Sequence, residues 1–275
     1  MPEQVRVGVD LGGTRIRVAA GGRPGNWSRR FQAPAPALAG LPQLLRRLWR
    51  RWRLSRGRVD ALVVAAKGIW TPAERRALEA RLGGFARRVR AISDAEAAFH
   101  GALDDEPGIL VLAGTGSIVL GQNRGGRRRR AGGLGALLGD EGSAFWIGRL
   151  WLKAAWSDER ARKIARDPDA VRRVAALAPS VLRRAARGHQ VARLIVTGSQ
   201  EMLAALTCQV AQDLGLRPTV RVSWAGSLMA NPVFRRGVWR ALERQGMRPR
   251  VVPPKRSPVV AARDLAVRLA EGARP

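Results

Sequence analysis

The sequence predicts an α/β protein built from two related halves, each a mixed β-sheet flanked by helices. Apolar patterns in the first hundred residues follow the order β-β-β-α-β-α-β-α. After residue 107 the chain opens again with a strand, a glycine turn and a second strand. The length of 275 residues, 46% of them hydrophobic, allows two domains of ordinary size with their own cores.

In the first half, a hairpin precedes alternating helices and strands. Apolar and polar residues alternate on both sides of a glycine-rich turn near residue 12, which is typical of paired strands. Thr71 and Pro72 are an N-cap and first helical residue for the second helix. The expected strands are Val5–Asp10, Arg15–Ala20, Trp27–Phe31, Asp60–Ala66 and Val89–Ile92, and the expected helices are Leu41–Leu54, Pro72–Leu82 and Ala95–Leu103.

The second half contains longer helical stretches. Thr197-Gly198-Ser199 has the composition of a phosphate loop, but helical spacing on both sides predicts a helix through it. Four arginines, Arg127–Arg130, lie between glycines and predict a solvated hairpin tip. The expected strands are Ile109–Ala113, Ile118–Leu120, Val220–Trp224 and Arg250–Val252, and the expected helices are one after Gly142, then Val171–Ala186, Val191–Leu214, Val233–Gln245 and Val260–Ala270.

The polar segment Asp104–Gly108, which contains a proline and a glycine, marks the expected domain junction. We expect an N-terminal domain over residues 1–106 and a C-terminal domain over residues 107–257. A last helix within residues 258–275 is expected to return to the N-terminal domain.

The composition excludes several classes of protein. A single cysteine, Cys208, excludes an internal disulfide and a multi-thiolate metal site within one chain. No apolar run approaches the roughly 18 residues that a membrane helix needs. The opening Met1-Pro2-Glu3-Gln4 leads directly into a strand-like run without a signal-peptide core. We therefore expect a soluble, cytoplasmic protein without a membrane partner.

The charge is strongly positive, with 50 Lys and Arg against 21 Asp and Glu and a net charge of +29. Two explanations compete: nucleic-acid binding, or the arginine-rich coding of a GC-rich genome. The basic residues are spread along the whole sequence, and no aromatic RNA-binding strand or zinc finger accompanies them. We favour the second explanation and do not expect a nucleic-acid partner.

Three glycine turns follow apolar strands and suit phosphate binding. Successive backbone N–H groups in such turns form anion-binding nests, and a hydroxyl beside the glycines adds a donor. Asp10 ends its strand and has the chemistry to hold Mg²⁺. The turns are Asp10-Leu11-Gly12-Gly13-Thr14, Gly114-Thr115-Gly116-Ser117 and Ala225-Gly226-Ser227.

These turns carry a family resemblance. Val7–Thr14 resembles the first phosphate motif of the sugar kinase/Hsp70/actin superfamily, and Gly114–Ser117 resembles the second. The stretch Gly132–Gly148, with GDEGS at residues 139–143, is similar to the hallmark of the BadF/BadG-type ATPase family, which includes N-acetylglucosamine and glucosamine kinases. The order and spacing of the motifs match across nearly the whole chain.

The resemblance implies two RNase H-like, actin-like ATPase domains that close over ATP in a central nucleotide cleft. It implies that Asp94 accepts the proton of a sugar hydroxyl, although Asp94 could instead cap the helix that follows it. The implied site residues are Asp10 for Mg²⁺; Gly12, Gly13, Thr14, Gly114, Thr115, Gly116 and Ser117 for the phosphates; Gly226 and Ser227 for the adenine and ribose; and Gly133, Leu134 and Asp140 for the sugar.

The sugar side departs from the family pattern. Leu134 stands where the family has a sugar-contacting tryptophan, so the identity of the acceptor is open. Lys67 and the arginines near Arg127 could bind an anionic substrate or could be solvated surface.

The expected function is therefore an ATP-dependent amino-sugar kinase that uses Mg²⁺ and a small sugar substrate; a homodimer is left open. One alternative is an ATPase of the same family that activates a 2-hydroxyacyl-CoA dehydratase. Such activators hold an iron–sulfur cluster with two cysteines from each subunit, whereas Cys208 supplies one. The other alternative is a degenerate kinase fold that binds polyanions or nucleic acid.

Overall fold

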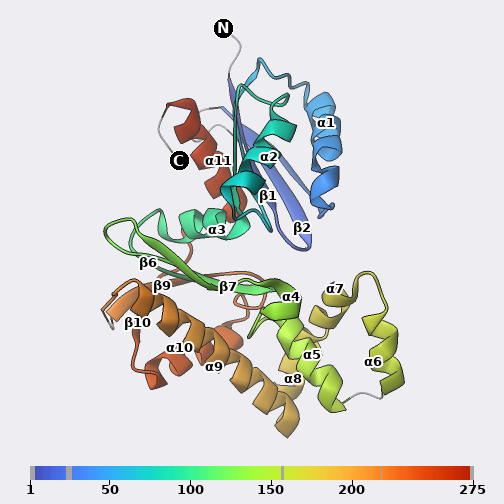
Figure 1. Ribbon diagram of the computed structural model, residues 1–275, viewed down its shortest axis with the longest axis vertical. Helices are drawn as coiled ribbons and strands as arrows, with labels where there is room; N and C mark the ends of the chain where they lie inside the picture. The colour runs from blue at the N-terminus through green and yellow to red at the C-terminus, as the bar shows by residue number, and fades with distance from the viewer. Residues whose placement is uncertain (1–3, 23–26, 156–157, 218, 273–275) are drawn as a thin grey trace. The chain divides into compact units, whose positions relative to one another are not determined.

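The computed structural model describes residues 4–22, 27–155, 158–217 and 219–272. The opening residues Met1 to Glu3 lie outside the described ranges. Tertiary contacts divide the chain into unit 1, Met1–Gly101 with Lys255–Pro275, and unit 2, Ala102–Pro254. Each unit is an α/β assembly around a five-stranded sheet, which confirms the predicted fold class (Figure 1).

The sheet of unit 1 has the order β3-β2-β1-β4-β5. Its first three strands pair antiparallel, whereas β4 pairs parallel with both β1 and β5. The strands are β1 (Val5–Leu11), β2 (Arg15–Gly21), β3 (Trp27–Pro34), β4 (Val59–Ala66) and β5 (Arg88–Ser93). The helices are η1 (Leu38–Gly40), α1 (Leu41–Trp52), α2 (Pro72–Leu82), α3 (Asp94–Leu103), which ends across the division, and α11 (Pro258–Ala270).

Both faces of this sheet are buried, because alternate residues of a strand point to opposite sides. Leu62 and Val64 of β4 join a core with the apolar sides of α1 and α2. Ala61, Val63 and Ala65 of the same strand pack on the other face against α11. The continuous apolar run of β4 therefore reflects a strand covered on both sides. The Leu41–Leu54 amphipathic pattern is explained by packing on the sheet.

The returning helix α11 approaches β1 very closely at Gly8. A Cβ atom built on Gly8 would lie 2.2 Å from the backbone nitrogen of Arg263. That contact involves backbone and not a flexible side chain, so it cannot be relieved by a rotamer change. The absence of a side chain at Gly8 thus sets the distance between helix and sheet.

The sheet of unit 2 has the order β10-β9-β6-β7-β8 and repeats the topology of unit 1. Strands β6, β7 and β8 pair antiparallel, and β9 pairs parallel with β6 and β10. This matching order supports the prediction that the two halves are related. The strands are β6 (Gly108–Ala113), β7 (Ser117–Gln122), β8 (Arg128–Gly132), β9 (Thr219–Ala225) and β10 (Arg248–Val251).

Helices α5, α8, α9 and α10 form one hydrophobic core with a face of this sheet. The predicted helix through Thr197-Gly198-Ser199 is confirmed, because α9 is continuous there. The helices are α4 (Gly135–Leu138), α5 (Ala144–Ala155), α6 (Asp158–Ala165), α7 (Ala170–Ala175), α8 (Ala178–Ala186), α9 (Gln190–Asp213) and α10 (Pro232–Arg244).

Two local predictions in unit 2 were wrong. The expected helix Val171–Ala186 is divided into α7 and α8, because Pro179 has no N–H to donate to the carbonyl of Ala175. The expected hairpin tip Arg127–Arg130 is mostly strand, since Arg128 to Arg130 pair with β7 at the edge of the sheet. Charged side chains on an edge strand also oppose pairing with another chain.

We predict that Gly8→Ala destabilises unit 1 by at least about 2 kcal/mol, because the new methyl group must displace the α11 backbone. Urea unfolding followed by circular dichroism measures this change. Gly57→Ala is the matched control, since its Cβ would meet no atom within 4 Å, and it should change stability by less than about 0.5 kcal/mol. Equal effects of the two substitutions would contradict the close-packing argument.

Candidate functional site

The candidate catalytic residues of unit 1 lie at the carboxyl ends of neighbouring parallel strands. Asp10 lies at the end of β1, opposite Ala65 of β4, and Lys67 directly follows β4. Ser93 ends β5, opposite Ala66, and Asp94 begins α3. Since β1, β4 and β5 run in the same direction, the topology gathers these side chains at one edge of the sheet, where α/β proteins bind ligands.

The first glycine turn is held by its carbonyl groups. The carbonyl of Leu11 accepts the N–H of Lys67, and that of Thr14 accepts the N–H of Ala35, each at 3.0 Å. The N–H of Gly12 donates to Arg15 at 3.1 Å. Within the described chain, the N–H groups of Gly13 and Thr14 have no hydrogen-bond acceptor, and both residues are exposed. The turn therefore presents two free donors, as an anion nest does.

Asp10 is a buried carboxylate with incomplete charge compensation. It is only 4% exposed, and Arg17 donates to its Oδ2 at 3.2 Å. Burial nevertheless raises the pKa of Asp10, because loss of hydration outweighs the attraction to Arg17.

The donor set of unit 1 suits Mg²⁺ better than a metal that needs a full protein cage. The described residues contain no group of three or more His, Cys, Asp and Glu side chains around a common point. Mg²⁺ commonly takes one or two carboxylates and completes its shell with water and phosphate oxygens. Asp10 can supply such a carboxylate, and a bound cation would compensate its buried charge.

Ser93 caps helix α3, so Asp94 is not needed for that task. The Oγ of Ser93 accepts the N–H of Glu96 at 3.1 Å, and the Glu96 carboxylate accepts the N–H of Ser93 at 2.8 Å. This reciprocal pair is a capping box. Asp94 itself accepts the N–H of Ala95 at 2.9 Å. The helix start is thus satisfied by its neighbours, and the Asp94 carboxylate is left for another role.

The surroundings of Asp94 give it the acid–base character of a proton acceptor near neutral pH. Burial and the nearby charge of Asp10 raise the pKa of Asp94 to about 6, against the opposing effects of the Ala95 N–H and of Lys67. A carboxylate with this pKa is ionised above pH 6 and still basic enough to accept a hydroxyl proton.

Lys67 is a residue whose importance the sequence left unresolved. Its Nζ lies 3.9 Å from the position that a Cβ atom on Gly13 would take, and its charge acts on Asp94. It is therefore a cation beside both the phosphate turn and the candidate base. The only signal in the sequence was its position immediately after the buried strand β4.

The second glycine turn, in unit 2, is anchored by the start of α5. The carbonyls of Gly114 and Thr115 accept the N–H groups of Ala144 and Phe145 at 2.9 and 3.1 Å. The N–H of Gly114 donates to Gly116 at 2.9 Å. As in unit 1, two N–H groups, those of Thr115 and Gly116, have no acceptor within the described ranges. This turn is a second candidate phosphate nest.

Asp140 and Ser117 are tied into the structure beneath this turn. The N–H of Ser117 donates to Oδ1 of Asp140 at 3.1 Å, and the Ser117 hydroxyl donates to the carbonyl of Glu141 at 2.6 Å. A Cβ on Gly116 would lie 2.6 Å from Oδ1 of Asp140, which explains the glycine. Asp140 is 5% exposed and has a left-handed backbone with φ of 62°. It thus supports the second glycine turn, a role that the sequence did not indicate.

The third glycine turn contacts the second one. Gly226 has φ of 91°, and a Cβ there would lie 2.3 Å from the carbonyl oxygen of Ala113. Ser227 packs against Gly114, with its Oγ 3.5 Å from the position of a Cβ on that residue. Because β6 and β9 are parallel neighbours, their ends bring Gly114, Gly226 and Ser227 together.

The expected sugar-contacting segment follows β8. Gly133 has φ of 73° and packs closely on Ile118, while Leu134 is 63% exposed. Leu134 thus presents an apolar side chain where the family pattern has an aromatic one.

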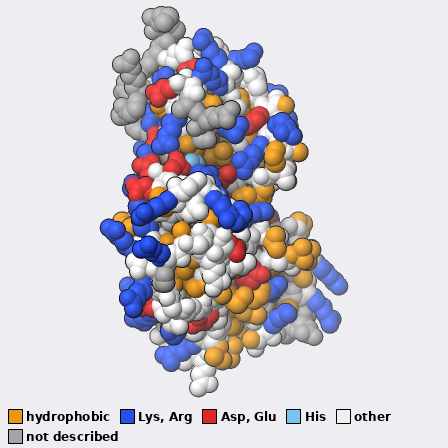
Figure 2. All heavy atoms as spheres, turned by 60° about the vertical axis from the view of Figure 1, so that its left-hand side comes forward, with side chains coloured by type: hydrophobic (Ala, Val, Ile, Leu, Met, Phe, Trp, Pro, Cys, Tyr) orange, Lys and Arg blue, Asp and Glu red, His pale blue; other side chains and the backbone are white. Residues whose placement is uncertain are grey.

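One face of the molecule shows how basic side chains are distributed on it. On the face shown in Figure 2, Lys and Arg side chains are scattered among other types and not collected in one continuous patch. No helix in the described ranges is both long and apolar enough to cross a membrane.

We predict that Asp94→Asn stabilises the protein at pH 8 by up to about 3 kcal/mol, because it removes a charge that burial disfavours. Because the pKa of Asp94 is higher in the folded protein than in the unfolded chain, ionisation of Asp94 lowers the free energy of unfolding as pH rises from about 4 to 6. The stability gained by Asp94→Asn should therefore disappear near pH 4. Denaturant unfolding of both proteins at the two pH values measures it. Exposed Asp213→Asn is the control, and a gain independent of pH would contradict the prediction.

Two curated proteins and one solved structure are similar to this chain. An N-acetylmuramic acid/N-acetylglucosamine kinase from Clostridium acetobutylicum is 41% identical over 88 residues, covering 31% of this chain and 29% of the relative. An N-acetyl-D-glucosamine kinase from Dictyostelium discoideum is 32% identical over 134 residues, covering 40% and 42%. The matched segments thus span less than half of each of these two curated relatives.

A crystal structure from Chromobacterium violaceum, whose description as an N-acetylglucosamine kinase is provisional, shares the fold with a TM-score of 0.71 at 23% identity, covering 97% of this chain and 100% of that one. A family model covers residues 7–262, which include the three glycine turns and Asp94. The chain therefore belongs to the BadF/BadG/BcrA/BcrD ATPase family.

Proposed function

We propose that the protein is an ATP-dependent kinase that phosphorylates a hydroxyl group of an amino sugar. The observation that carries the proposal is Asp94, a carboxylate with a pKa of about 6 at the same sheet edge as a phosphate nest and Asp10. The kinase names of the two curated relatives support the same reaction class, although only part of each relative is matched.

Asp94 is the proposed general base. It accepts the proton of the attacking hydroxyl, which then forms a bond to the γ-phosphorus of ATP while the bond to the β,γ-bridging oxygen breaks. The products are ADP and a phosphorylated sugar. Phosphoryl transfer needs positioning and charge neutralisation more than covalent help, so one suitably placed carboxylate suffices.

The glycine turns are proposed to bind the nucleotide. The N–H groups of Gly13 and Thr14 in unit 1, and those of Thr115 and Gly116 in unit 2, donate to phosphate oxygens. Gly12, Gly114 and Ser117 shape these turns, and Gly226 with Ser227 contacts the nucleoside. Asp10 would hold Mg²⁺, and the ion when bound would neutralise phosphate charge.

Lys67 has two proposed effects at this site. Its ammonium group, close to Gly13, attracts the γ-phosphate, whose negative charge must be stabilised during transfer. It also keeps the Asp94 pKa lower than burial and Asp10 alone would set it. A cation here increases the fraction of the base that is ionised at neutral pH.

Gly133 and Leu134 are proposed to contact the sugar, whereas Asp140 is proposed to act indirectly, by holding the second glycine turn. An exposed leucine can cover an apolar sugar face but lacks the electron-rich ring of tryptophan. The acceptor is therefore best sought in a panel of glucosamine, N-acetylglucosamine and N-acetylmuramic acid.

The surroundings of Cys208 disfavour the alternative function as an activator of a dehydratase. The thiol is partly buried against the core of unit 2, and burial raises its pKa. Iron–sulfur ligation requires the thiolate, which these surroundings disfavour. The polyanion-binding alternative would be supported by a continuous basic surface, and the face shown in Figure 2 does not present one.

We predict that the protein releases ADP and forms a phosphosugar with at least one member of the panel in the presence of ATP and Mg²⁺. Asp94→Asn should reduce kcat by about 10²- to 10⁴-fold, because proton acceptance is lost. Asp213→Asn makes the same chemical change at an exposed helix end and should retain activity. Coupled ADP detection and mass spectrometry of the product measure both. Unchanged turnover by Asp94→Asn would remove Asp94 from the mechanism.

We predict that kcat/KM falls below about pH 6, where Asp94 becomes protonated. Lys67→Met should move this acid limb to higher pH, since Lys67 lowers the Asp94 pKa, and should also reduce kcat. Lys67→Arg keeps the charge and should leave the limb in place. Complete pH–rate profiles of the three proteins decide this, and an unmoved limb in Lys67→Met would show that Lys67 does not act on the base.

A further inference from the structure

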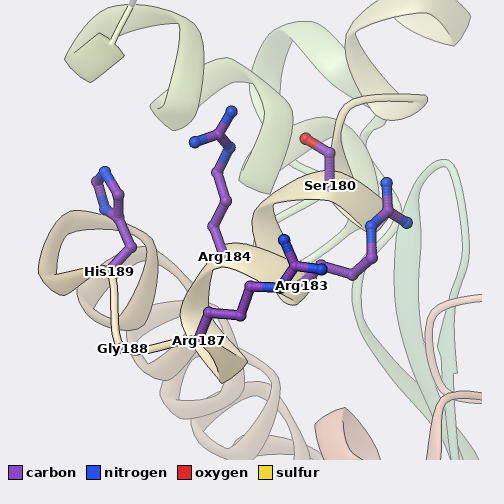
Figure 3. Close-up of a pocket in the computed structure, with 6 residues that line it drawn as sticks. All are labelled: Ser180, Arg183, Arg184, Arg187, Gly188 and His189. Carbon is purple, nitrogen blue, oxygen red and sulfur yellow. The ribbon is translucent and has the colours of Figure 1, made fainter.

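A basic pocket lies in unit 2, where α8 ends and α9 begins. It is lined by Ser180, Arg183, Arg184, Arg187, Gly188 and His189 and has a volume of about 670 Å³ (Figure 3). None of these residues belongs to the glycine turns or to the segment assigned to the sugar. The pocket is therefore a feature that the proposed kinase reaction does not explain.

Helical geometry places the cations of this pocket on one side. Ser180, Arg183 and Arg184 are spaced i, i+3 and i+4 along α8, which puts them on one helix face, and Arg187 follows at i+7 as the C-cap residue. The chain then turns at Gly188, with φ of 94°, and His189 begins α9 as its N-cap. In Figure 3, Ser180, Arg184 and His189 point to the same side.

Trp151 orders two of the pocket side chains. The guanidinium carbon of Arg184 lies 5.5 Å from the centre of the Trp151 ring, and the His189 ring meets that ring edge-on at 5.3 Å. Trp151 belongs to α5 and is itself buried. Contact with this buried ring thus restrains Arg184 and His189, which lowers the entropy cost of binding a ligand.

His189 presents a hydrogen-bond donor. Its Nδ1 accepts the N–H of Ala192 at 3.4 Å, so in the neutral ring the proton lies on Nε2. Together with the Ser180 hydroxyl and the guanidinium groups, this gives the pocket donors of three chemical kinds.

Among the described residues, no carboxylate compensates the positive charge of the pocket. In the part of the chain that the structure describes, no carboxylate pairs with Arg183, Arg184 or Arg187. Arginines elsewhere do find partners, as in the pair between Arg172 and Asp169 at 2.5 Å. Like charges three and four residues apart repel on a helix, and the dipole at the end of α8 offsets this only in part. A bound anion would remove the repulsion.

We propose that this pocket is a binding site for a small phosphate-bearing anion. Several guanidinium forks with hydroxyl and imidazole donors suit an anion that has many acceptor oxygens and more than one negative charge. A concave site of limited size at one helix junction fits a small ligand better than a nucleic acid, which needs an extended basic track.

The test compares two triple variants that remove the same charge. Arg183→Gln, Arg184→Gln and Arg187→Gln are combined in one protein, and Arg46→Gln, Arg47→Gln and Arg50→Gln on the exposed side of α1 are combined in the other. Calorimetric titration of the full chain with pyrophosphate, at fixed ionic strength, measures binding. We expect the pocket variant to bind at least about tenfold more weakly than the unsubstituted protein, and the α1 variant to change affinity less than about twofold.

Two further probes identify the source of the phosphate. Titrations of the unsubstituted protein with inorganic phosphate and with a hexose 6-phosphate show whether it binds a free anion or a phosphomonoester more tightly. Whichever of the two ligands binds should bind more weakly to the pocket variant. Arg187→Gln alone is a milder variant, expected to weaken binding while preserving the melting temperature.

Three results would overturn the proposal. One is the absence of pyrophosphate binding by the unsubstituted protein. The second is equal weakening by the two triple variants, since this would reflect overall charge. The third is unchanged affinity in the pocket variant, because the anion would then be held at another site, such as the glycine turns.

Discussion

The parallel alignment of β1, β4 and β5 is the constraint on which the candidate site of unit 1 depends. It brings Asp10, Lys67 and Asp94, which lie far apart in the sequence, to one edge of one sheet. Parallel strands of this kind need both faces covered, and α11 supplies part of that cover by its close contact at Gly8. The packing of a helix from the far end of the chain therefore holds the strands that position the candidate base.

Unit 2 has the same strand order, and there the strand ends bring glycine turns together. The ends of β6 and β9 bring two glycine turns into contact, and the first amides of α5 hold one of them by its carbonyls. In both units two carbonyl groups of the turn accept hydrogen bonds from the fold, while two N–H groups have no acceptor among the described residues. The topology of each unit thus leaves donors of the kind that the proposed phosphate binding requires.

Buried charge at the candidate site conflicts with stability. Burial raises the cost of ionising both Asp10 and Asp94, and the charge of Asp10 raises that of Asp94 further. A fold that retains both carboxylates gives up stability that neutral side chains would provide. The same electrostatic cost brings the pKa of Asp94 to about 6, which is the range that its proposed role as a base requires.

The sequence by itself determined the strand and helix pattern, the family motifs and the positions of the glycine turns. These are local properties: periodicity, the backbone freedom of glycine and residue type suffice to indicate them. Its two errors had different origins. The break before α8 follows from Pro179, a local signal, whereas the strand over Arg128–Arg130 depends on hydrogen bonds to β7.

Only the tertiary structure decided which polar groups face one another. The capping of α3 by Ser93, the burial of Asp140 under Gly116 and the position of Lys67 near Gly13 all involve side-chain directions or residues distant in the sequence. The basic pocket beside Trp151 likewise required α5, α8 and α9 to be packed together. Spacing along a chain specifies neighbours on one element, whereas contacts between elements are set by how all of them pack.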